Sequence, residues 1–220
     1  MNEALFFAHV LLVLGFILVA YRMGRSSLIA LIVLLGVLAN VFVVKQMELF
    51  CWTVTCSDVF AIGGILGLNL LQEGWGQETA GKAIRGSLLC LIFFVAMAQI
   101  HLLYVPSAAD KTQDAFAMIL SSSPRIVFAS IAVYYVVQKI DVKIFGFLKH
   151  FFAGKLLPVR LTLSLLFSQL LDTILFSFLG LYGLVESIVD VIFMSYFVKC
   201  VIIASSSTFV AAAKRWVRPA

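Results

Sequence analysis

Seven long runs of apolar residues, each closed off by charged or polar residues, constrain this chain more than any other feature. A helix needs about 20 mostly apolar residues to cross roughly 30 Å of hydrocarbon. Because 63% of the residues are hydrophobic and only 12% are charged, the chain lacks the polar surface that a soluble domain of 220 residues requires. We therefore predict an all-α polytopic membrane protein with seven spans, at residues 4–21, 27–44, 53–72, 86–104, 122–138, 161–184 and 188–210. Apolar character resumes at 144–152, so the alternative is that the fifth helix ends in that stretch.

Short loops join these runs, and no stretch rich in Gly, Ser or Pro separates them. Residues 1–220 are therefore expected to form a single transmembrane domain. The first run follows Glu3 instead of a basic segment and ends without a small-residue cleavage site, so we expect it to stay in the mature protein.

The distribution of Lys and Arg between alternate loops predicts the orientation of the spans, because cytoplasmic loops carry an excess of both. The loops after spans one, three and five and the C-terminal tail hold twelve: Arg22, Arg25, Lys82, Arg85, Lys139, Lys143, Lys149, Lys155, Arg160, Lys214, Arg215 and Arg218. The opposite side holds three: Lys45, Lys111 and Arg125. We predict the N-terminus outside and the C-terminus in the cytoplasm. The net charge of +5 belongs to these loops, so no direct nucleic-acid binding is expected.

Three polar residues lie near the predicted middle of the membrane. Gln169 and Asp172 are three residues apart and share one face of the sixth span. Asp172 and Lys199 each lie eleven residues inside their spans, which corresponds to a depth of about 16 Å. Charges at this depth are costly and mark pathways or partners. We expect Asp172 and Lys199 to pair or to hold a substrate between them, the alternative being a purely structural ion pair.

A second polar group lies on the second and third spans. Asn40 and Lys45 are near the outer end of one, and Asn69 and Glu73 share a face near the inner end of the other. These four residues are candidates for the same site. Lys45 is equally well interpreted as a snorkelling interface residue and Glu73 as a solvated helix end. Asp58 is interpreted as a charge at a helix N-terminus.

Metal and disulfide chemistry receive little support from the sequence. Neither His9 nor His101 has a second ligand at metal spacing, so no metal site is expected. Cys51 and Cys56 fall in a predicted outer loop, where they either form a bridge or remain free thiols.

Nucleotide hydrolysis and intramembrane catalysis are also poorly supported. The segment 76–83 resembles a phosphate-binding loop but has Ala83 where Ser or Thr should contact magnesium, and no strand precedes it. Any ATP-driven step would require partner chains. The strings Gly-x-Ser-Gly and Gly-x-Gly-Asp are absent, and the two intraspan aspartates, Asp58 and Asp172, are predicted at different depths. We therefore expect a transporter instead of an enzyme.

Three sequence strings carry a family resemblance. They are Ala-Asn-Val-Phe-Val-Val-Lys at 39–45, Asn-Leu-Leu-Gln-Glu-Gly-Trp-Gly at 69–76 and Ser-Gln-Leu-Leu-Asp-Thr-Ile-Leu-Phe at 168–176, and Tyr-Phe-Val-Lys at 196–199 adds to them. Together they resemble the queuosine precursor transporter family, one of the vitamin uptake transporters, which is similar to the substrate-binding components of energy-coupling-factor transporters. Asn69 stands where that family usually has Asp, although an amide can still hydrogen-bond a base edge.

The resemblance implies a six-helix core at 27–212, preceded by an additional N-terminal helix at 1–26. It implies import of queuine or a related 7-deazapurine base across a bacterial inner (plasma) membrane, without a cofactor and with energy-coupling partner chains as one option. Importers of other vitamin-like molecules are the nearest alternative, and an intramembrane enzyme is a more distant one. The expected substrate-binding residues are Asn40, Lys45, Asn69, Glu73, Gln169, Asp172 and Lys199.

Overall fold

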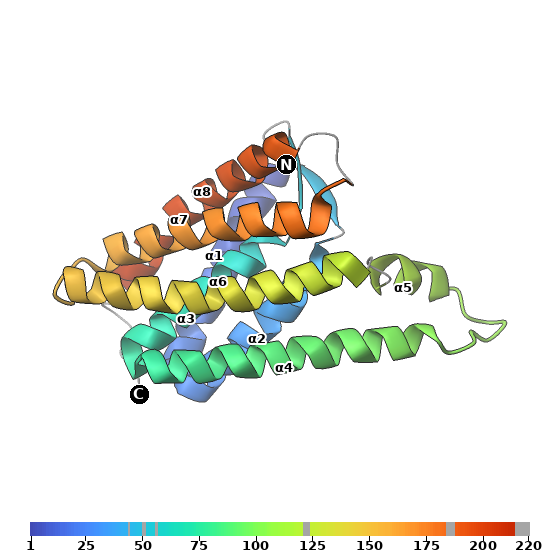
Figure 1. Ribbon diagram of the computed structural model, residues 1–220, viewed down its shortest axis with the longest axis horizontal. Coiled ribbons are helices and arrows are strands. Elements are labelled where there is room, and N and C mark those ends of the chain that lie inside the picture. Colours follow the sequence, from blue (N-terminus) through green and yellow to red (C-terminus); the bar gives the residue numbers. More distant parts are fainter. Residues whose placement is uncertain (44, 50–51, 56, 121–123, 184–187, 214–220) are drawn as a thin grey trace.

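The computed structural model describes the chain except for residues 44, 50–51, 56, 121–123, 184–187 and 214–220. It is an all-α bundle with one small β-hairpin (Figure 1). The elements are α1 (Asn2–Met23), α2 (Arg25–Phe42), β1 (Gln46–Leu49), β2 (Trp52–Thr55), α3 (Asp58–Trp75), α4 (Gln77–Leu102), α5 (Gln113–Leu120), α6 (Pro124–Phe151), α7 (Leu157–Phe176), the π-helix η1 (Ser177–Leu181) and α8 (Ile188–Ala213).

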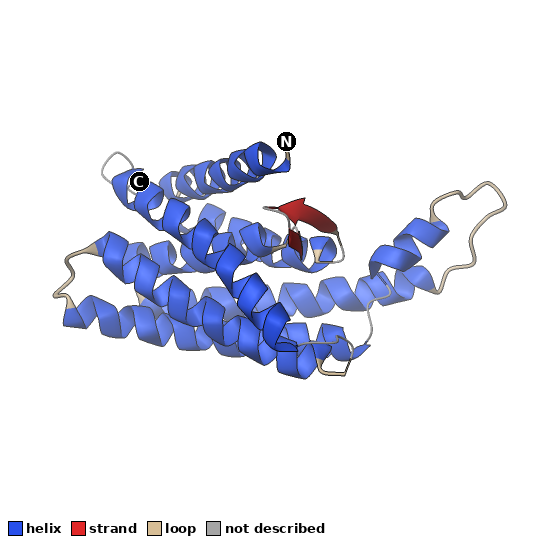
Figure 2. Ribbon diagram, turned by 90° about the horizontal axis from the view of Figure 1, so that it is seen from above, coloured by secondary structure: helices blue, strands red, loops and turns tan. Residues whose placement is uncertain are grey.

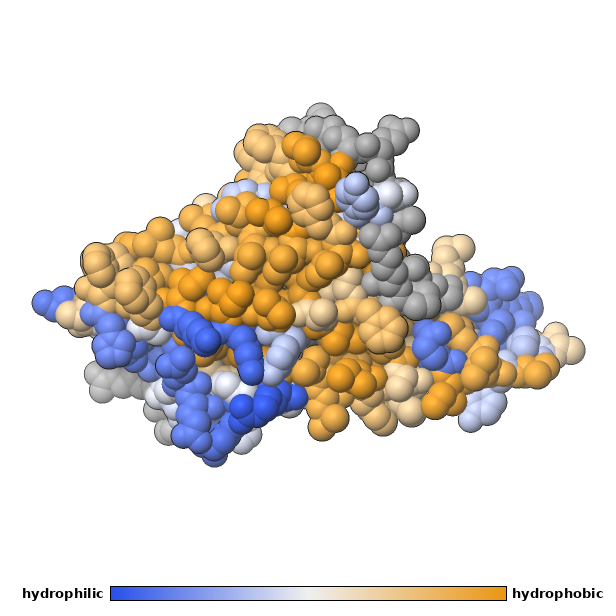
Figure 3. All heavy atoms as spheres, in the orientation of Figure 1, coloured by the Kyte–Doolittle hydropathy of each residue, from blue (hydrophilic) through white to orange (hydrophobic). Residues whose placement is uncertain are grey.

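Among the described residues, four helical segments are long and apolar enough to cross a membrane: α1, α2, α4 and the continuous segment of α7 and η1. Apolar side chains cover the middle of the face seen in Figure 3, and hydrophilic residues gather toward its two ends. This band agrees with a bilayer around the middle of the bundle, because lipid replaces water there as the solvent for apolar side chains.

The N-terminal helix α1 packs into the same core as the rest of the bundle. It contacts α2, α3 and α8. Its buried face carries Val10, Leu14 and Ile17, spaced as one side of a helix requires. Where α1 meets the end of α3, the ring of Tyr21 lies edge-on to the ring of Trp75, with centroids 5.2 Å apart.

A β-hairpin occupies the connection between α2 and α3, where the sequence predicted the start of the third span at residue 53. Strands β1 and β2 pair antiparallel, with Gln46 opposite Thr55 and Leu49 opposite Trp52 (Figure 2). The Asn2 side-chain amide donates to the Glu48 carbonyl at 2.9 Å and ties the hairpin to the N-terminus. The prediction was wrong here because β-branched and aromatic residues count as apolar in a membrane scan, yet they also favour strands. The possible Cys51–Cys56 bridge lies outside the described residues.

Several helices extend beyond the predicted spans. Helix α4 begins nine residues before the predicted start at residue 86, α6 continues thirteen residues past the predicted end at 138, and α7 begins at Leu157 instead of 161. These extensions carry many of the Lys and Arg residues that the sequence placed in loops. Apolar run length reports the width of the hydrocarbon layer, and a helix can continue into water beyond it. Helix α5 was not predicted.

The turns between α3 and α4 and between α6 and α7 lie at one end of the molecule, and the hairpin and the connection from α4 to α5 lie at the other (Figure 1). The connections alternate between the two ends as they do for successive antiparallel helices, and the orientation in the membrane stays a prediction.

Candidate functional site

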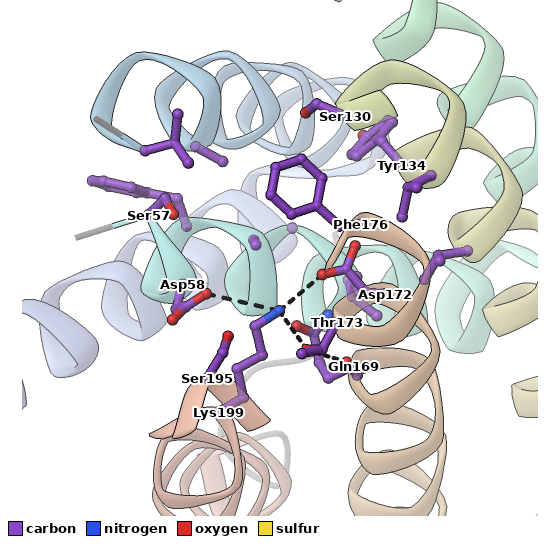
Figure 4. Close-up of a pocket in the computed structure, with 18 of the residues that line it drawn as sticks. Ser57, Asp58, Ser130, Tyr134, Gln169, Asp172, Thr173, Phe176, Ser195 and Lys199 are labelled. Carbon is purple, nitrogen blue, oxygen red and sulfur yellow. Dashed lines mark hydrogen bonds and ion pairs between the residues drawn. The ribbon is translucent and has the colours of Figure 1, made fainter. Parts of the chain in front are cut away.

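A cavity of about 420 Å³ lies inside the bundle. This volume falls within the range of roughly 300–1,000 Å³ that is typical of small-molecule sites. Helices α2, α3, α6, α7 and α8 and the π-helix η1 all contribute to its wall (Figure 4). Its polar and aromatic lining includes Asn40, Ser57, Asp58, Phe60, Ser130, Tyr134, Gln138, Gln169, Asp172, Thr173, Phe176, Ser177, Ser195 and Lys199.

Three charged residues from three different helices meet in this cavity, and we call them the cavity triad: Asp58 of α3, Asp172 of α7 and Lys199 of α8. The Lys199 ammonium lies 2.8 Å from Oδ2 of Asp172 and 3.8 Å from Oδ1 of Asp58. It also donates to the Thr173 hydroxyl at 3.0 Å. Figure 4 shows the lysine nitrogen between the two carboxylates. The predicted pairing of Asp172 with Lys199 is therefore present.

The triad leaves acceptor capacity facing the cavity. The lysine side chain is only 6% exposed, whereas that of Asp172 is 27% exposed. With all three groups ionised, two carboxylates and one ammonium give the cavity a net charge of −1. An ionised carboxylate accepts at both oxygens. The triad can therefore accept hydrogen bonds from a ligand, and its charge favours one that carries a positive charge.

Aromatic rings border the charged group. The Phe176 ring projects into the open space above the triad, and Tyr134 lies across from it (Figure 4). Directly after Phe176 the chain changes from α- to π-helix, and Ser177 and Leu181 of that π-helix also line the cavity. Single π-helical turns often occur at functional sites, because they change the direction of the side chains that follow. The cavity therefore combines charge with aromatic faces on which a planar ring can stack.

Two amide side chains complete the polar lining. The Asn40 amide donates to the Gly36 carbonyl at 3.0 Å, and its oxygen accepts from the Ser130 hydroxyl at 3.0 Å, which joins α2 to α6. Gln169 is 1% exposed, and neither polar atom of its amide has a hydrogen-bond partner in the described protein. An unpaired buried amide costs about 1–3 kcal/mol, so Gln169 is available to a ligand in the cavity.

Four of the seven predicted site residues line the cavity: Asn40, Gln169, Asp172 and Lys199. The other three lie elsewhere. Lys45 is exposed at the end of the connection from α2 to β1. Asn69 is fully buried beside Asp141, deeper in the bundle. Glu73 lies at the far end of α3.

Glu73 belongs to a second ionic group, which we call the helix-end clamp: Glu73 of α3, Lys149 of α6 and Arg160 of α7. Arg160 is 0% exposed and binds both carboxylate oxygens of Glu73 at 3.1 Å. Its Nε and Nη2 also donate to the carbonyls of Lys155 and Gly154, respectively. The sequence counted Arg160 among loop charges, and that assignment was wrong, because the guanidinium fastens the turn between α6 and α7 to the end of α3.

The interpretation of Asp58 as only a helix-terminal charge was also incomplete. It does lie in the first turn of α3, but it also lines the cavity and faces Lys199. The predicted difference in depth between Asp58 and Asp172 was misleading. Counting residues from each helix start does not reveal how helices are staggered, and here the first turn of α3 is level with the middle of α8. The described residues contain no group of three or more His, Cys, Asp or Glu side chains that could hold a metal ion.

The fold and the cavity define a helical membrane protein with a cavity inside its bundle that is lined by charged, amide and aromatic side chains. The family model described as "Putative vitamin uptake transporter" matches residues 59–213. A protein from Bacillus subtilis (strain 168) named "Probable queuosine precursor transporter" is 30% identical over an alignment of 220 residues, which covers 97% of this chain and 94% of that relative. The chain therefore belongs to the vitamin uptake transporter family. No solved structure matches it.

Proposed function

We propose that this transporter imports queuine or a related 7-deazapurine base across the bacterial plasma membrane. The observation that carries the proposal is the cavity triad beside aromatic rings in a cavity of about 420 Å³. The name of the Bacillus subtilis relative supports the same substrate class.

The chemistry of the cavity fits such a base in three ways. A guanine-like edge presents adjacent N–H donors, which the carboxylates of Asp58 and Asp172 and the amide oxygen of Gln169 can accept. An aminomethyl substituent is protonated at neutral pH and matches the net charge of −1. The flat bicyclic ring can stack on Phe176. These features favour a cationic 7-deazapurine over an uncharged one.

The proposed transport unit crosses the membrane seven times, through α1, α2, α3, α4, α6, α7 with η1, and α8. The N-terminus lies outside and the C-terminus in the cytoplasm. The imbalance of Lys and Arg between the two ends supports this orientation. Accessibility of single cysteines to an impermeant reagent in intact cells tests it. A cysteine in the hairpin should react and one in the turn between α6 and α7 should not; the reverse pattern would refute the orientation.

Complementation tests the substrate class. The gene is expressed in cells that cannot make queuosine, lack their own importer and contain the enzyme that inserts the supplied base into tRNA. Feeding queuine should restore queuosine in tRNA. An unchanged tRNA despite membrane expression argues against 7-deazapurines.

Another vitamin-like molecule is the competing substrate, since the family description names only vitamins. Thermal stabilisation of the purified protein separates the two cases. Queuine should raise the melting temperature at concentrations where guanine and unrelated vitamins do not, because a ligand that binds only the folded state stabilises it. Stabilisation by a different vitamin alone would reassign the cavity.

A further inference from the structure

Asp141 of α6 is a buried carboxyl that the cavity does not use. It is 0% exposed and lies between the cavity and the helix-end clamp. Both hydroxyls that bind it, those of Ser164 and Ser168 on α7, donate to the same oxygen, Oδ1, at 2.6 Å. The other oxygen, Oδ2, has no hydrogen-bond partner in the described protein.

No positive charge accompanies Asp141. Among the described residues it forms no ion pair, in contrast to Asp58 and Asp172, which share Lys199. The charged residues on the surrounding elements are exposed or paired with others. Lys139 and Lys143 of α6 and Lys82 and Arg85 of α4 are exposed. Glu73 of α3 binds Arg160 of α7 and Lys149 of α6, Glu78 of α4 binds Lys82, and Lys199 of α8 binds Asp172 of α7. An ionised carboxylate without such compensation is very costly at this depth.

The hydrogen-bond geometry at Asp141 accommodates a neutral carboxylic acid. In the acid form one oxygen is a carbonyl, which accepts two hydrogen bonds, and the other carries the proton and acts as a donor. Oδ1 accepts from two serines as the carbonyl would. Asn69 of α3 lies beside Asp141 and is fully buried; its amide nitrogen can donate to the ionised carboxylate, and its amide oxygen has no donor among the described residues. A proton on Oδ2 would supply that donor.

Buried polar side chains lie on both sides of this carboxyl, toward the cavity and toward the helix-end clamp. On one side Gln138, one turn earlier on α6, is buried and lines the cavity. On the other side Gln72 of α3 is buried, donates to the Val142 carbonyl at 2.9 Å and adjoins Glu73 of the helix-end clamp. Gln138 and Gln72 each keep an amide oxygen without a hydrogen-bond partner. Together with Asn69 they form a column of buried polar groups inside an otherwise apolar core.

We propose that Asp141 is the proton-binding site that couples substrate import to a transmembrane pH gradient. A proton from the outer side binds Oδ2 and forms the neutral acid. It leaves toward the cytoplasmic end, and the carboxylate returns to the outward-accessible state before the next cycle. The inference rests on the proposed transport function, and it requires no partner ATPase.

Purified protein in liposomes tests the coupling, with radiolabelled queuine as the probe and the membrane potential clamped at zero. A gradient of one pH unit is worth about 1.4 kcal/mol per proton. At that gradient, one coupled proton drives at most about tenfold accumulation of queuine. Wild-type protein should accumulate queuine when the outside is acidic. Asp141→Asn mimics the neutral acid, so it should keep queuine exchange between equal pools but lose the accumulation. The matched control Asp110→Asn, in an exposed loop, should keep both.

Each outcome separates the two proposals. Absence of queuine exchange by the wild-type protein refutes queuine as the substrate, not Asp141 as the proton site. Accumulation by Asp141→Asn equal to wild type, or accumulation driven by a sodium gradient instead of a pH gradient, overturns the proton site.

Two further measurements need no accumulation by the variant. Queuine entry through wild-type protein should carry protons with it, seen as alkalinisation of a weakly buffered outer medium, and unchanged pH overturns the proposal. In infrared spectra the wild-type protein should show a carboxylic-acid C=O band that is missing in Asp141→Asn. A band that is unchanged by the substitution would also overturn the proposal.

Discussion

The cavity triad and the helix-end clamp are each built from three charged residues on three helices. They differ in how far their polar atoms are occupied by partners inside the protein. In the clamp, Arg160 is fully buried, and each of its three guanidinium nitrogens donates to Glu73 or to a backbone carbonyl. In the triad, Lys199 is occupied but Asp172 keeps 27% of its side chain exposed toward a cavity. With every group ionised, the clamp has a net charge of +1 and the triad has −1.

The difference distinguishes a structural ion cluster from a binding site. A buried charge that has lost its partner is very costly, so a group whose donors are all satisfied inside the protein serves mainly to hold helices together. A group with acceptors facing a cavity can exchange protein contacts for ligand contacts. Removing a charge should therefore damage folding at the clamp and binding at the triad.

The largest effect is expected at the clamp. Glu73→Ala leaves the Arg160 guanidinium buried without a counter-charge, which costs about 3–5 kcal/mol. The variant should insert poorly or aggregate in detergent, and what remains should melt well below wild type. Size-exclusion chromatography and thermal unfolding measure this. Glu78→Ala, which removes an exposed carboxylate paired with Lys82 on the surface of α4, is the control and should behave as wild type. Equal melting of both variants would contradict the assignment.

The helices were far easier to predict than the clamp. Each predicted run overlaps one long helix, because the width of the hydrocarbon layer imposes a minimum apolar length on the sequence. Arg160 was counted among the loop charges because it lies in a short polar stretch, and Asp141 lies just past the predicted end of the fifth span at residue 138. Their burial depends on partners 87 and 23 residues away in the chain, Glu73 and Ser164. A hydropathy pattern contains no information about such pairs.

The next effect is expected at the triad. Asp172→Asn keeps the shape of the side chain but removes a charge, and a hydrogen bond to a charged group is worth about 1.5–3 kcal/mol. Queuine affinity should therefore fall about 10- to 100-fold. The melting temperature should change much less than in Glu73→Ala, because Lys199 retains Asp58 and Thr173 as partners. Isothermal titration of purified protein measures the affinity, and a loss of folding as severe as in Glu73→Ala would remove the distinction between the two groups.

A combined substitution sharpens this test. Asp172→Asn combined with Lys199→Met, made in an Asp58→Asn background, removes all three charges of the triad and leaves none of them unpaired. If the triad only stabilises the bundle, transport should return to near the wild-type rate. If it binds the substrate, the combined variant should insert normally and remain inactive.

A smaller effect is expected at the aromatic wall of the cavity, which is formed by Phe176 and Tyr134. Phe176→Leu keeps apolar volume but removes the ring face, which should cost about 0.5–1.5 kcal/mol, or roughly 2- to 10-fold in queuine affinity. Phe178→Leu, two residues later and 50% exposed on the outside of the bundle, is the matched control and should not change binding. Equal affinities of the two variants would exclude stacking on Phe176.

The binding site was only partly visible in the sequence, for a related reason. Asp172 and Lys199 were found because charges in long apolar runs are conspicuous, and counting residues gave both the same depth. Asp58 lies at a helix start, where acidic residues are common, and only the stagger of α3 against α8 reveals its role. With twenty Phe in the chain, no pattern could single out Phe176.

The smallest effect is expected at Asn40, whose amide is already satisfied by Gly36 and Ser130. Asn40→Ala should lower queuine affinity about two- to fivefold, since a hydrogen bond of this kind contributes about 0.5–1 kcal/mol net. Ser130→Ala removes the other side of the same contact and is the matched variant. If Asn40 acts only by joining α2 to α6, the two single variants and the double variant should bind equally well, because each removes the same interaction. If Asn40 also contacts the base, Asn40→Ala should bind more weakly than Ser130→Ala, and the double variant should follow Asn40→Ala. Wild-type affinity in Asn40→Ala would remove Asn40 from the site and leave substrate recognition to the triad, Gln169 and the aromatic wall.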